Sequence, residues 1–394
     1  MISKKMQPLM ANNSVIRTMF EEGHIMKKIY GEENVYDFSL GNPNVPAPPE
    51  VKQAILDILE EEKSQVLHGY MSNAGFEDVR EAVALHINRT QGTELSSRNI
   101  IMTAGAAGGI NVALKTILDP EEEVIIFKPY FLEYNWYVNN FDGKVIQAET
   151  DAFFQPDLKD FESRINEKTR VLLLNSPNNP TGIIYSEETI KKIAGILIKK
   201  QKELGRTLFI LADEPYRELA YDGNRVPCIM KYYPNTIVSY SYSKTLSLPG
   251  ERIGYLVIPD ELEESGLVID TAANANRIAG FVNAPSLQQK IIKKCVSAKA
   301  DVAYYDRNRK ALYGCITDCG FQCIKPQGAF YLFVKSPVPD EKEFCKAAKK
   351  YNIIMVPGSS FAVPGYVRLA YCVSYETILA SFDSFKKLAA EYNR

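Results

Sequence analysis

The sequence predicts an α/β fold in which a mostly parallel seven-stranded sheet is sandwiched by helices and followed by a smaller α+β unit. First, short β-branched runs alternate with amphipathic helical stretches up to about residue 285, a pattern typical of sheets covered on both faces. Second, the order then changes, because long helical patterns precede the strand-like ones. Third, 394 residues with 46% hydrophobic side chains can bury a large core.

Seven apolar, β-prone runs are the candidate strands of the large sheet. A helix is expected to begin after Pro48-Pro49, since proline suits the first helical turn. Another is expected from Ser186, whose hydroxyl can cap free amides, to Gly205, where a helix can end in a left-handed turn. The candidate strands are residues 99–102, 124–127, 144–148, 170–175, 207–212, 236–240 and 252–258.

The residues after 285 carry the second unit. Its predicted elements are helices at 286–298 and 302–318, a strand at 328–334, a helix at 341–351, a strand at 367–373 and a terminal helix. We therefore expect three parts, which are an N-terminal segment that packs with the small domain (1–45), a large domain (46–285) and a small C-terminal domain (286–394).

Composition excludes several classes of protein. Lys plus Arg number 46 and Asp plus Glu 48, so no basic surplus points to nucleic acid or to an anionic membrane. The first residues lack a leader-like apolar core, no run is long enough to span a bilayer, and an odd count of seven cysteines favours reduced thiols, so we expect a cytoplasmic protein. Cys315, Cys319 and Cys323 are evenly spaced, but Gly320 interrupts them and no histidine lies near, so packing is expected and no metal.

The most informative segment is Ser241-Tyr242-Ser243-Lys244, with Arg252 eight residues after the lysine. It follows a β-prone run, so the lysine is expected at a strand end beside hydroxyls and a cation. A lysine amine becomes a nucleophile toward an aldehyde when desolvation or a nearby cation lowers its pKa, and a phosphate binds hydroxyl and guanidinium donors. The segment favours a Schiff base beside a phosphate. A surface lysine and a solvated arginine around a turn remain the alternative.

Two loops follow other candidate strands. Gly105-Ala106-Ala107 opens a helix, so its backbone amides can approach a phosphate at the positive end of the helix, although small residues there also permit tight packing. Asn178-Asn179-Pro180 ends the strand at 170–175, and its rigid loop can aim Asn179 at a ligand oxygen or be a plain turn.

Two charged residues are expected on buried strands. Asp213 ends a very apolar run and needs a partner there, either a protonated ring nitrogen or an arginine in a structural ion pair. Arg368 has apolar neighbours, and its planar guanidinium suits a carboxylate, unless it lies on a solvated edge strand. Because open α/β sheets bind ligands at their strand ends, we expect Asp213 near Lys244.

Together these segments resemble, over nearly the whole chain, the fold type I pyridoxal phosphate-dependent aminotransferases of the aspartate aminotransferase superfamily (class I/II). The resemblance implies pyridoxal 5'-phosphate as the cofactor, bound to Lys244 as a Schiff base, with Lys244 later acting as the proton-moving base. It also implies that Asp213 keeps the pyridine nitrogen protonated. The segments that carry it are, in chain order, Gly41 to Pro43, Tyr70, the loop at Gly105, the loop at Asn179, Asp213 with Tyr216, Ser241 to Lys244 with Arg252, and Arg368.

The same resemblance assigns the remaining cofactor contacts. Tyr216 and Asn179 are expected to hydrogen-bond to the ring oxygen, and Phe131 to stack on the ring without the polar edge that is often found there. The residues implied around the phosphate are Gly105, Ala106, Ala107, Ser241, Ser243, Arg252 and, from the second subunit of a homodimer with shared active sites, Tyr70. The loop at Gly105 lacks the hydroxyl that other versions carry, so its donors differ.

Arg368 is expected to bind the substrate α-carboxylate, with Gly41 and Asn179 assisting. Arg277 is offset from the family's spacing and either reads a distal carboxylate across the subunit interface or ends a helix on the surface. In the second case the side-chain pocket sets specificity, and its possible aromatic neighbours are Phe20, Tyr36 and Trp136.

The resulting expectation is an aminotransferase that moves an amino group between an L-amino acid and a 2-oxo acid, with 2-oxoglutarate as the acceptor, by a ping-pong mechanism. A carbon–sulfur β-lyase on the same scaffold is the alternative, because fold does not fix reaction. A DNA-binding regulator is not expected, since we see no basic N-terminal helix-turn-helix segment in the sequence and its first strong helix lies inside the enzyme-like region. A nicotinamide oxidoreductase also lacks support, since Gly105 to Gly109 does not have the G-x-G-x-x-G spacing.

Overall fold

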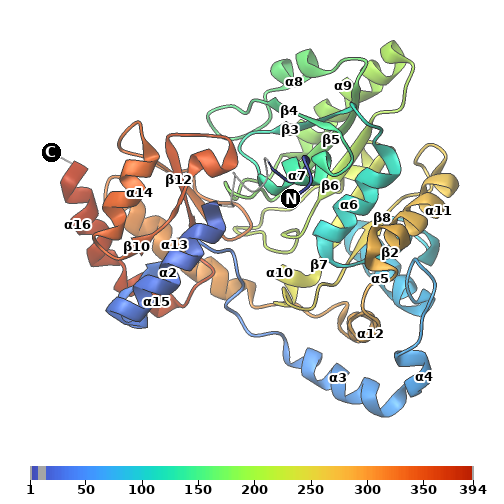
Figure 1. Ribbon diagram of the computed structural model, residues 1–394, viewed down its shortest axis with the longest axis horizontal. Helices are drawn as coiled ribbons and strands as arrows, with labels where there is room; N and C mark the ends of the chain where they lie inside the picture. The colour runs from blue at the N-terminus through green and yellow to red at the C-terminus, as the bar shows by residue number, and fades with distance from the viewer. Residues whose placement is uncertain (1, 8–14, 393–394) are drawn as a thin grey trace.

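The computed structural model describes residues 2–7 and 15–392, and its central element is a seven-stranded sheet (Figure 1). Strand β8 runs antiparallel to both of its neighbours, whereas the other pairs are parallel. The mostly parallel seven-stranded sheet expected from the sequence is thus confirmed. In spatial order the strands are β2 (Ile100–Thr103), β8 (Gly254–Val257), β7 (Thr236–Ser241), β6 (Phe209–Asp213), β5 (Thr169–Asn175), β3 (Glu123–Phe127) and β4 (Lys144–Ala148).

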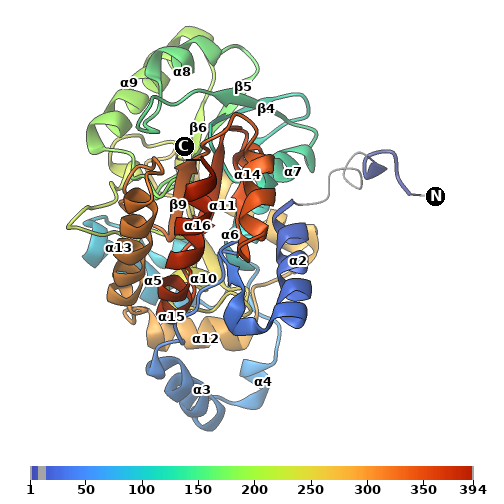
Figure 2. The same ribbon diagram turned by 90° about the vertical axis from the view of Figure 1, so that its left-hand side faces the viewer.

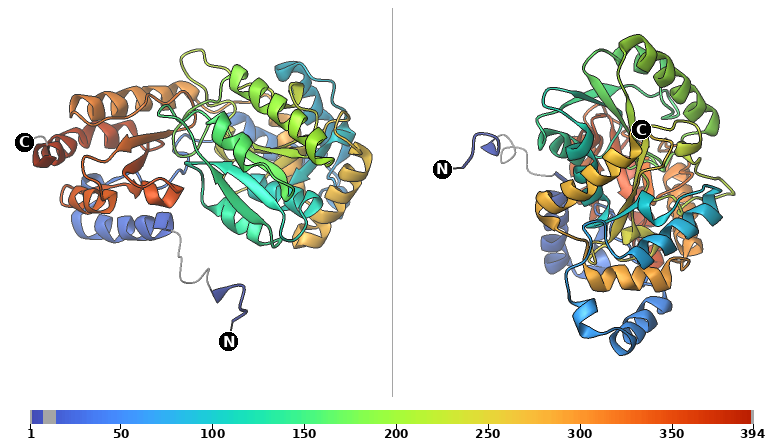
Figure 3. Two further views of the ribbon diagram at one scale, coloured as in Figure 1. Left: turned by 90° about the horizontal axis from the view of Figure 1, so that it is seen from above. Right: turned by 90° about the vertical axis from the view of Figure 1, so that its right-hand side faces the viewer.

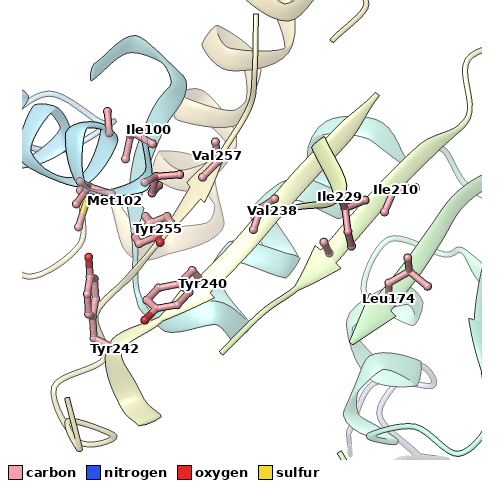
Figure 4. Packing of buried hydrophobic residues seen from close by; sticks show 14 of the residues in the cluster. Ile100, Met102, Leu174, Ile210, Ile229, Val238, Tyr240, Tyr242, Tyr255 and Val257 are labelled. Atoms are coloured by element: carbon pink, nitrogen blue, oxygen red, sulfur yellow. The ribbon is translucent and has the colours of Figure 1, made fainter. Parts of the chain in front are cut away.

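Alternate residues of each strand point to opposite faces of this sheet, and two apolar clusters result. In β5, Leu172 and Leu174 join one cluster, whereas Val171 and Leu173 join the other. Figure 4 shows the first cluster around β6, β7 and β8. The helices on the first face are α3 (Pro49–Glu61), α4 (Ser64–Leu67), α5 (Glu77–Gln91), α8 (Leu158–Arg164), α9 (Glu187–Leu204) and α12 (Ser286–Cys295); those on the second are α6 (Gly105–Ile117), α7 (Glu133–Asn139) and α11 (Ser265–Asn276).

The helix ends follow the local chemistry read from the sequence. Ser186 Oγ accepts a hydrogen bond from the Thr189 amide at 3.0 Å, so one of the free amides at the start of α9 is satisfied. Gly205 ends the same helix with a left-handed φ of 63°. Helix α3 begins at Pro49, as expected for proline in a first turn.

A second set of elements surrounds a three-stranded antiparallel sheet of order β11-β12-β9. Its apolar cluster includes Cys315 and Cys319, and none of the seven cysteines, all of which lie among the described residues, forms a disulfide. Seen from above, this set lies beside the large sheet (Figure 3). Its elements are β9 (Tyr331–Lys335), β11 (Val356–Pro357), β12 (Tyr366–Ala370), α13 (Val302–Asp318), α14 (Glu341–Lys349), α15 (Tyr375–Ala380) and α16 (Phe382–Tyr392).

The N-terminal segment packs on this second set, on the side of α14 and α16 (Figure 2). It contains α2 (Val15–Tyr30) and β1 (Tyr36–Asp37), and β1 pairs in parallel with β10 (Ile353–Ile354). The rings of Phe38 and Phe385 lie 5.9 Å apart. Helix α12, which the expected boundary at residue 285 gives to the small domain, contributes its buried residues to the larger core. The boundaries 1–45, 46–285 and 286–394 stay a prediction.

Most of the observed strands differ from the predicted ones by one to three residues at an end, and two of these differences concern residues of the predicted site. Strand β6 extends through Asp213, so this carboxylate belongs to the strand itself. Strand β8 begins at Gly254 instead of residue 252, because Arg252 has a left-handed φ of 51° that a strand cannot contain. Short 3-10 helices join the elements at Glu32–Asn34, Ser97–Asn99, Ile229–Lys231 and Gly358–Phe361.

The described residues lack two features of other classes of protein. No helix within residues 2–7 and 15–392 is both long and apolar enough to cross a membrane. In the same part of the chain, no group of three or more His, Cys, Asp or Glu side chains lies close enough together to hold a metal ion.

Candidate active site

A cavity of about 320 Å³ lies at the carboxyl ends of β5, β6 and β7, where the second set of elements meets the large sheet. Open α/β sheets bind ligands at such ends, and the volume is within the usual range of small-molecule sites, roughly 300–1,000 Å³. The sequence-predicted site residues that line it are Gly41, Ala106, Ala107, Phe131, Asn179, Asp213, Tyr216, Ser241, Ser243, Lys244, Arg252 and Arg368.

Lys244 lies in α10 (Tyr242–Thr245), a single helical turn that follows β7 directly. The Ser241 hydroxyl caps this turn by accepting from the Ser243 amide at 3.2 Å. The ammonium of Lys244 donates to the Gly41 carbonyl at 2.8 Å, which fixes its direction toward the cavity. Burial lowers the pKa of Lys244 to about 8, and the positive charges of Arg252 and Arg368 act in the same sense. An appreciable fraction of the amine is therefore neutral near neutral pH.

Asp213 ends β6 and is buried. Its Oδ2 accepts a hydrogen bond from the Tyr134 hydroxyl at 2.5 Å, whereas its Oδ1 is buried without a partner. No arginine pairs with it among the described residues, so the structural ion pair considered from the sequence is absent there. Burial raises the pKa of Asp213 to about 7, and the Tyr134 hydrogen bond opposes this rise. A protonated nitrogen at Oδ1 would satisfy the carboxylate.

Arg368 lies in β12, the middle strand of the small sheet, and is only 2% exposed. Its Nη1 donates to Asn179 Oδ1 at 3.0 Å and its Nη2 to the Ser39 carbonyl at 2.6 Å, while Nε has no partner. The guanidinium lies between the rings of Tyr331 and Phe361, with centroids 4.6 and 4.7 Å away. A solvated edge-strand arginine, the alternative from the sequence, is therefore wrong, and this guanidinium is held ready for an anion.

The other wall of the cavity is built to receive an anion. Arg252 Nη1 donates to Ser243 Oγ at 3.4 Å, and the hydroxyls of Ser241 and Ser243 lie 2.7 Å apart. Gly105 begins α6 with a φ of 71°, and a Cβ there would come within 2.5 Å of the Arg252 guanidinium. Gly105 does not line the cavity itself, but its lack of a side chain lets Arg252 approach the helix start. The positive helix end, two hydroxyls and a guanidinium therefore converge.

Several lining residues escaped the sequence analysis. Tyr134 packs edge-on against Phe131 with ring centroids 5.7 Å apart. Its position three residues after Phe131 was the sequence signal that could have predicted it as a lining residue. Tyr331 shares a 2.9 Å hydroxyl contact with Tyr216. Asn175 Oδ1 accepts from the Asn179 amide at 2.8 Å. Asn175, at the end of a predicted strand, was the easiest of the three to find.

Tyr70 and Arg277 are not brought into this cavity. Tyr70 is 95% exposed, and Arg277 is exposed at the start of a π-helical turn, η4 (Arg277–Phe281). The two segments lie on one surface, because Asn276 Nδ2 donates to the Asn73 carbonyl at 3.1 Å and Asn283 Nδ2 to the Ser72 carbonyl at 2.7 Å.

The aromatic neighbours suggested for the substrate side chain are also elsewhere. Tyr36 lies in β1 and packs on the small core, and Trp136 does not line the cavity, where Tyr134 and Tyr137 lie instead. The reason is helical geometry, since α7 turns Trp136 to a different side from residues 134 and 137. The side chain of Phe20 lies outside the described residues.

Comparison with known proteins agrees with this geometry. Residues 33–381 match the family described as aminotransferase class I and II. The crystal structure of an aminotransferase from Eubacterium rectale is 45% identical with a TM-score of 0.97, over 100% of this chain and 99% of that one. An aspartate aminotransferase from Thermus thermophilus, solved with maleate, is 25% identical with a TM-score of 0.87, over 98% and 99%. Aromatic-amino-acid aminotransferase 2 of Thermococcus litoralis is 29% identical, over 97% of each chain.

The chain therefore belongs to the class I and II aminotransferase family. It is an aminotransferase of fold type I, and pyridoxal phosphate is its cofactor. The cavity fits this group on three independent grounds. The free Oδ1 of Asp213 suits a protonated pyridine nitrogen, the space beside Gly105 and Arg252 suits a phosphate, and the Lys244 amine suits an aldehyde. The three proteins described above are all named as aminotransferases, so these comparisons do not favour a β-lyase.

Proposed function

We propose that the protein transfers an amino group between an L-amino acid and a 2-oxo acid, with 2-oxoglutarate as the acceptor, in a ping-pong sequence at this cavity. One observation carries the proposal. The amine of Lys244, a free carboxylate oxygen of Asp213 and a free guanidinium N–H of Arg368 line the same space. These are a nucleophile and base, an anion for a pyridinium, and a cation for a carboxylate.

Lys244 has two tasks in this proposal. Its neutral amine, favoured by the burial that lowers its pKa, would hold the cofactor covalently at the aldehyde carbon, with water as the leaving group. When a substrate amine takes its place, the freed Nζ would accept the proton from the substrate Cα and later donate it back. Pyridoxal phosphate, when bound, supplies a ring that accepts the electron pair left on Cα. The Gly41 carbonyl holds Nζ in the cavity between these steps.

Asp213 is proposed to keep the ring nitrogen protonated. The Tyr134 hydroxyl donates to Oδ2 and Oδ1 has no partner, so one oxygen of this cavity-lining carboxylate remains for the ring N–H. Tyr216 and Asn179 are proposed to donate to the ring oxygen, and Phe131 to cover one ring face. Their places in the lining of the cavity support these roles.

The phosphate is proposed to bind at Arg252, Ser241, Ser243 and the backbone amides of Gly105, Ala106 and Ala107, with Tyr70 from a second subunit. Arg252 is a fixed positive charge beside two hydroxyls, which supports this place for a dianion. The 95% exposure of Tyr70 supports a partner that covers it, so we propose a homodimer with shared active sites. The seven cysteines, none of which forms a disulfide, and the family support a cytoplasmic enzyme.

Arg368 is proposed to bind the α-carboxylate of both substrates, assisted by Asn179 and Gly41. Its Nε has no hydrogen-bond partner and can therefore donate to a bound carboxylate. The rings of Tyr331 and Phe361 restrict the orientation of the guanidinium. Arg277 is proposed as the residue that reads a distal carboxylate from the neighbouring subunit.

A substrate panel tests the proposed reaction. Aspartate and aromatic amino acids come first as donors, because the matched relatives carry these substrates in their names. With 2-oxoglutarate as acceptor, we expect glutamate to form in step with the loss of the donor, and we expect no glutamate from Lys244→Ala. Release of pyruvate and ammonia from cysteine without glutamate would instead support the β-lyase.

A further inference from the structure

A half-buried carboxylate lies behind the active site and outside its lining. Glu218 follows Tyr216 in the turn after β6, and its Oε2 accepts from the Tyr240 hydroxyl at 2.8 Å and from the Thr245 hydroxyl at 3.0 Å. The two hydroxyls lie 2.6 Å apart, so the three oxygens form a closed triangle. None of these three residues lines the cavity, so any effect on the reaction is indirect.

The triangle holds both ends of the segment that carries Lys244. Tyr240 lies just before the Ser241 cap, and Thr245 directly follows the lysine. A single helical turn has almost no internal hydrogen bonds, so its position depends on contacts from outside. Glu218 supplies such contacts from the turn that follows Asp213 and also carries Tyr216. Figure 4 shows Tyr240 beside Tyr242 and Tyr255, whose ring centroids lie 5.2 and 4.8 Å from its own.

We propose that Glu218 is a positioning residue for Lys244: it anchors the one-turn helix α10 through Tyr240 and Thr245 and keeps the lysine amine inside the cavity. The proposal rests on the role of Lys244 proposed above. It connects the turn that follows Asp213 at the end of β6 to the turn that carries Lys244. The Thr245 carbonyl, which accepts from the Ala300 amide at 2.7 Å, provides a further fixed point.

The acceptor atoms, not the charge, carry this role. Burial raises the pKa of Glu218, the Tyr240 hydrogen bond opposes the rise, and Glu218 is not among the charges that shift the pKa of Lys244. The triangle contains three oxygen–oxygen contacts but only two hydroxyl protons. A third proton would allow every one of these contacts to be a hydrogen bond. A glutamine offers both an acceptor and N–H donors at the same place, and Glu218→Gln is therefore expected to preserve the support that Glu218→Ala removes.

The test measures the reactivity of Lys244 in the cofactor-free full-length protein as a function of pH. An amine-acylating reagent followed by peptide mass mapping gives the pH at which Lys244 is half reactive. We expect this midpoint near pH 8 in wild type, because the amine reacts above its pKa of about 8. In Glu218→Ala the turn loosens and water reaches the amine, so the midpoint moves up toward the unperturbed lysine value, about 10.4. Glu218→Gln is expected to stay near wild type.

Two further variants separate positioning from general stability. Tyr240→Phe with Thr245→Val removes both donors and is expected to raise the midpoint as Glu218→Ala does, with no additional rise when the three changes are combined. Leu388→Ala, in the core of the small unit, is the matched control that lowers the melting temperature and leaves the midpoint unchanged. A Glu218→Ala midpoint that coincides with wild type, or one that Leu388→Ala reproduces, would overturn the proposal.

The same samples distinguish a failure of this inference from a failure of the proposed function. Wild-type protein is loaded with pyridoxal phosphate, reduced with borohydride and mapped. If Lys244 carries no cofactor, the proposed function fails. If Lys244 carries it and the midpoints of all variants coincide, only the positioning role of Glu218 fails.

Discussion

The strand ends of the large sheet and the exposed loop at residues 68–73 belong to the same predicted site, yet their surroundings differ greatly. Asp213 and Lys244 are held by hydrogen bonds within one chain, through Tyr134 and the Gly41 carbonyl. Tyr70 is 95% exposed. A side chain at a strand end is fixed by the sheet that carries it, whereas an exposed aromatic side chain depends on something outside the chain. The proposed site therefore divides into a part that one chain builds and a part for which we propose a second copy.

The largest effect is expected from a substitution in the part of the site that one chain builds. Asp213→Asn removes the anion proposed to hold the ring nitrogen protonated, so turnover is expected to fall by ~10² to 10⁴ while the cofactor still binds. Steady-state kinetics measure the turnover, and the absorbance of bound cofactor shows whether the variant still binds it. Tyr134→Phe is the matched control, because it keeps the carboxylate and removes only its hydrogen bond, so its loss is expected to be smaller. Near-normal turnover of Asp213→Asn would reduce Asp213 to a structural residue.

The next effect concerns Arg368. Arg368→Lys keeps the positive charge and loses the planar fork, so kcat/KM for every amino acid is expected to fall about 10- to 100-fold, the scale of a lost charged hydrogen bond. The expected loss is independent of the donor side chain, because the α-carboxylate is common to all donors. A loss confined to one donor would contradict its assignment to the α-carboxylate.

Mixing inactive chains sharpens the division between the two parts. Tyr70→Ala chains and Lys244→Ala chains are each expected to be impaired alone, but a heterodimer contains one site with both residues intact. Random mixing is expected to restore about a quarter of wild-type activity, since half of the dimers gain one of two sites. Size-exclusion chromatography of the mixture checks that dimers form. Activity that never exceeds the better parent would reject a shared site.

The smallest and most selective effect is expected at Arg277. Arg277→Leu is expected to lower kcat/KM about tenfold with aspartate, through a lost charge pair, and to leave an apolar donor unchanged. Parallel kinetics on aspartate and leucine measure the difference. Equal effects on both donors would make Arg277 a surface residue that ends a helix and would give specificity to the cavity walls near Tyr137.

These same residues show how much of the fold and of the site could be predicted from the sequence. Strand β4 was predicted residue for residue, and α9 was bounded by its Ser186 cap and Gly205, because turn chemistry and side-chain alternation are local. The site residues at strand ends were predicted because the carboxyl ends of parallel strands lie at the same edge of a sheet. The Tyr134–Asp213 contact was missed because it joins positions 79 residues apart, and no local pattern encodes it. The left-handed Arg252 was missed because arginine rarely adopts that conformation.

The most direct test of the central claim is chemical. Purified protein is incubated with pyridoxal phosphate, treated with borohydride and digested, and the peptide that carries the reduced cofactor is identified by mass. The account predicts one labelled position, Lys244, together with loss of all amino transfer after reduction. Label on a different lysine, or protein that takes up no cofactor, would contradict the assignment of the cavity between β5, β6 and β7 as the active site.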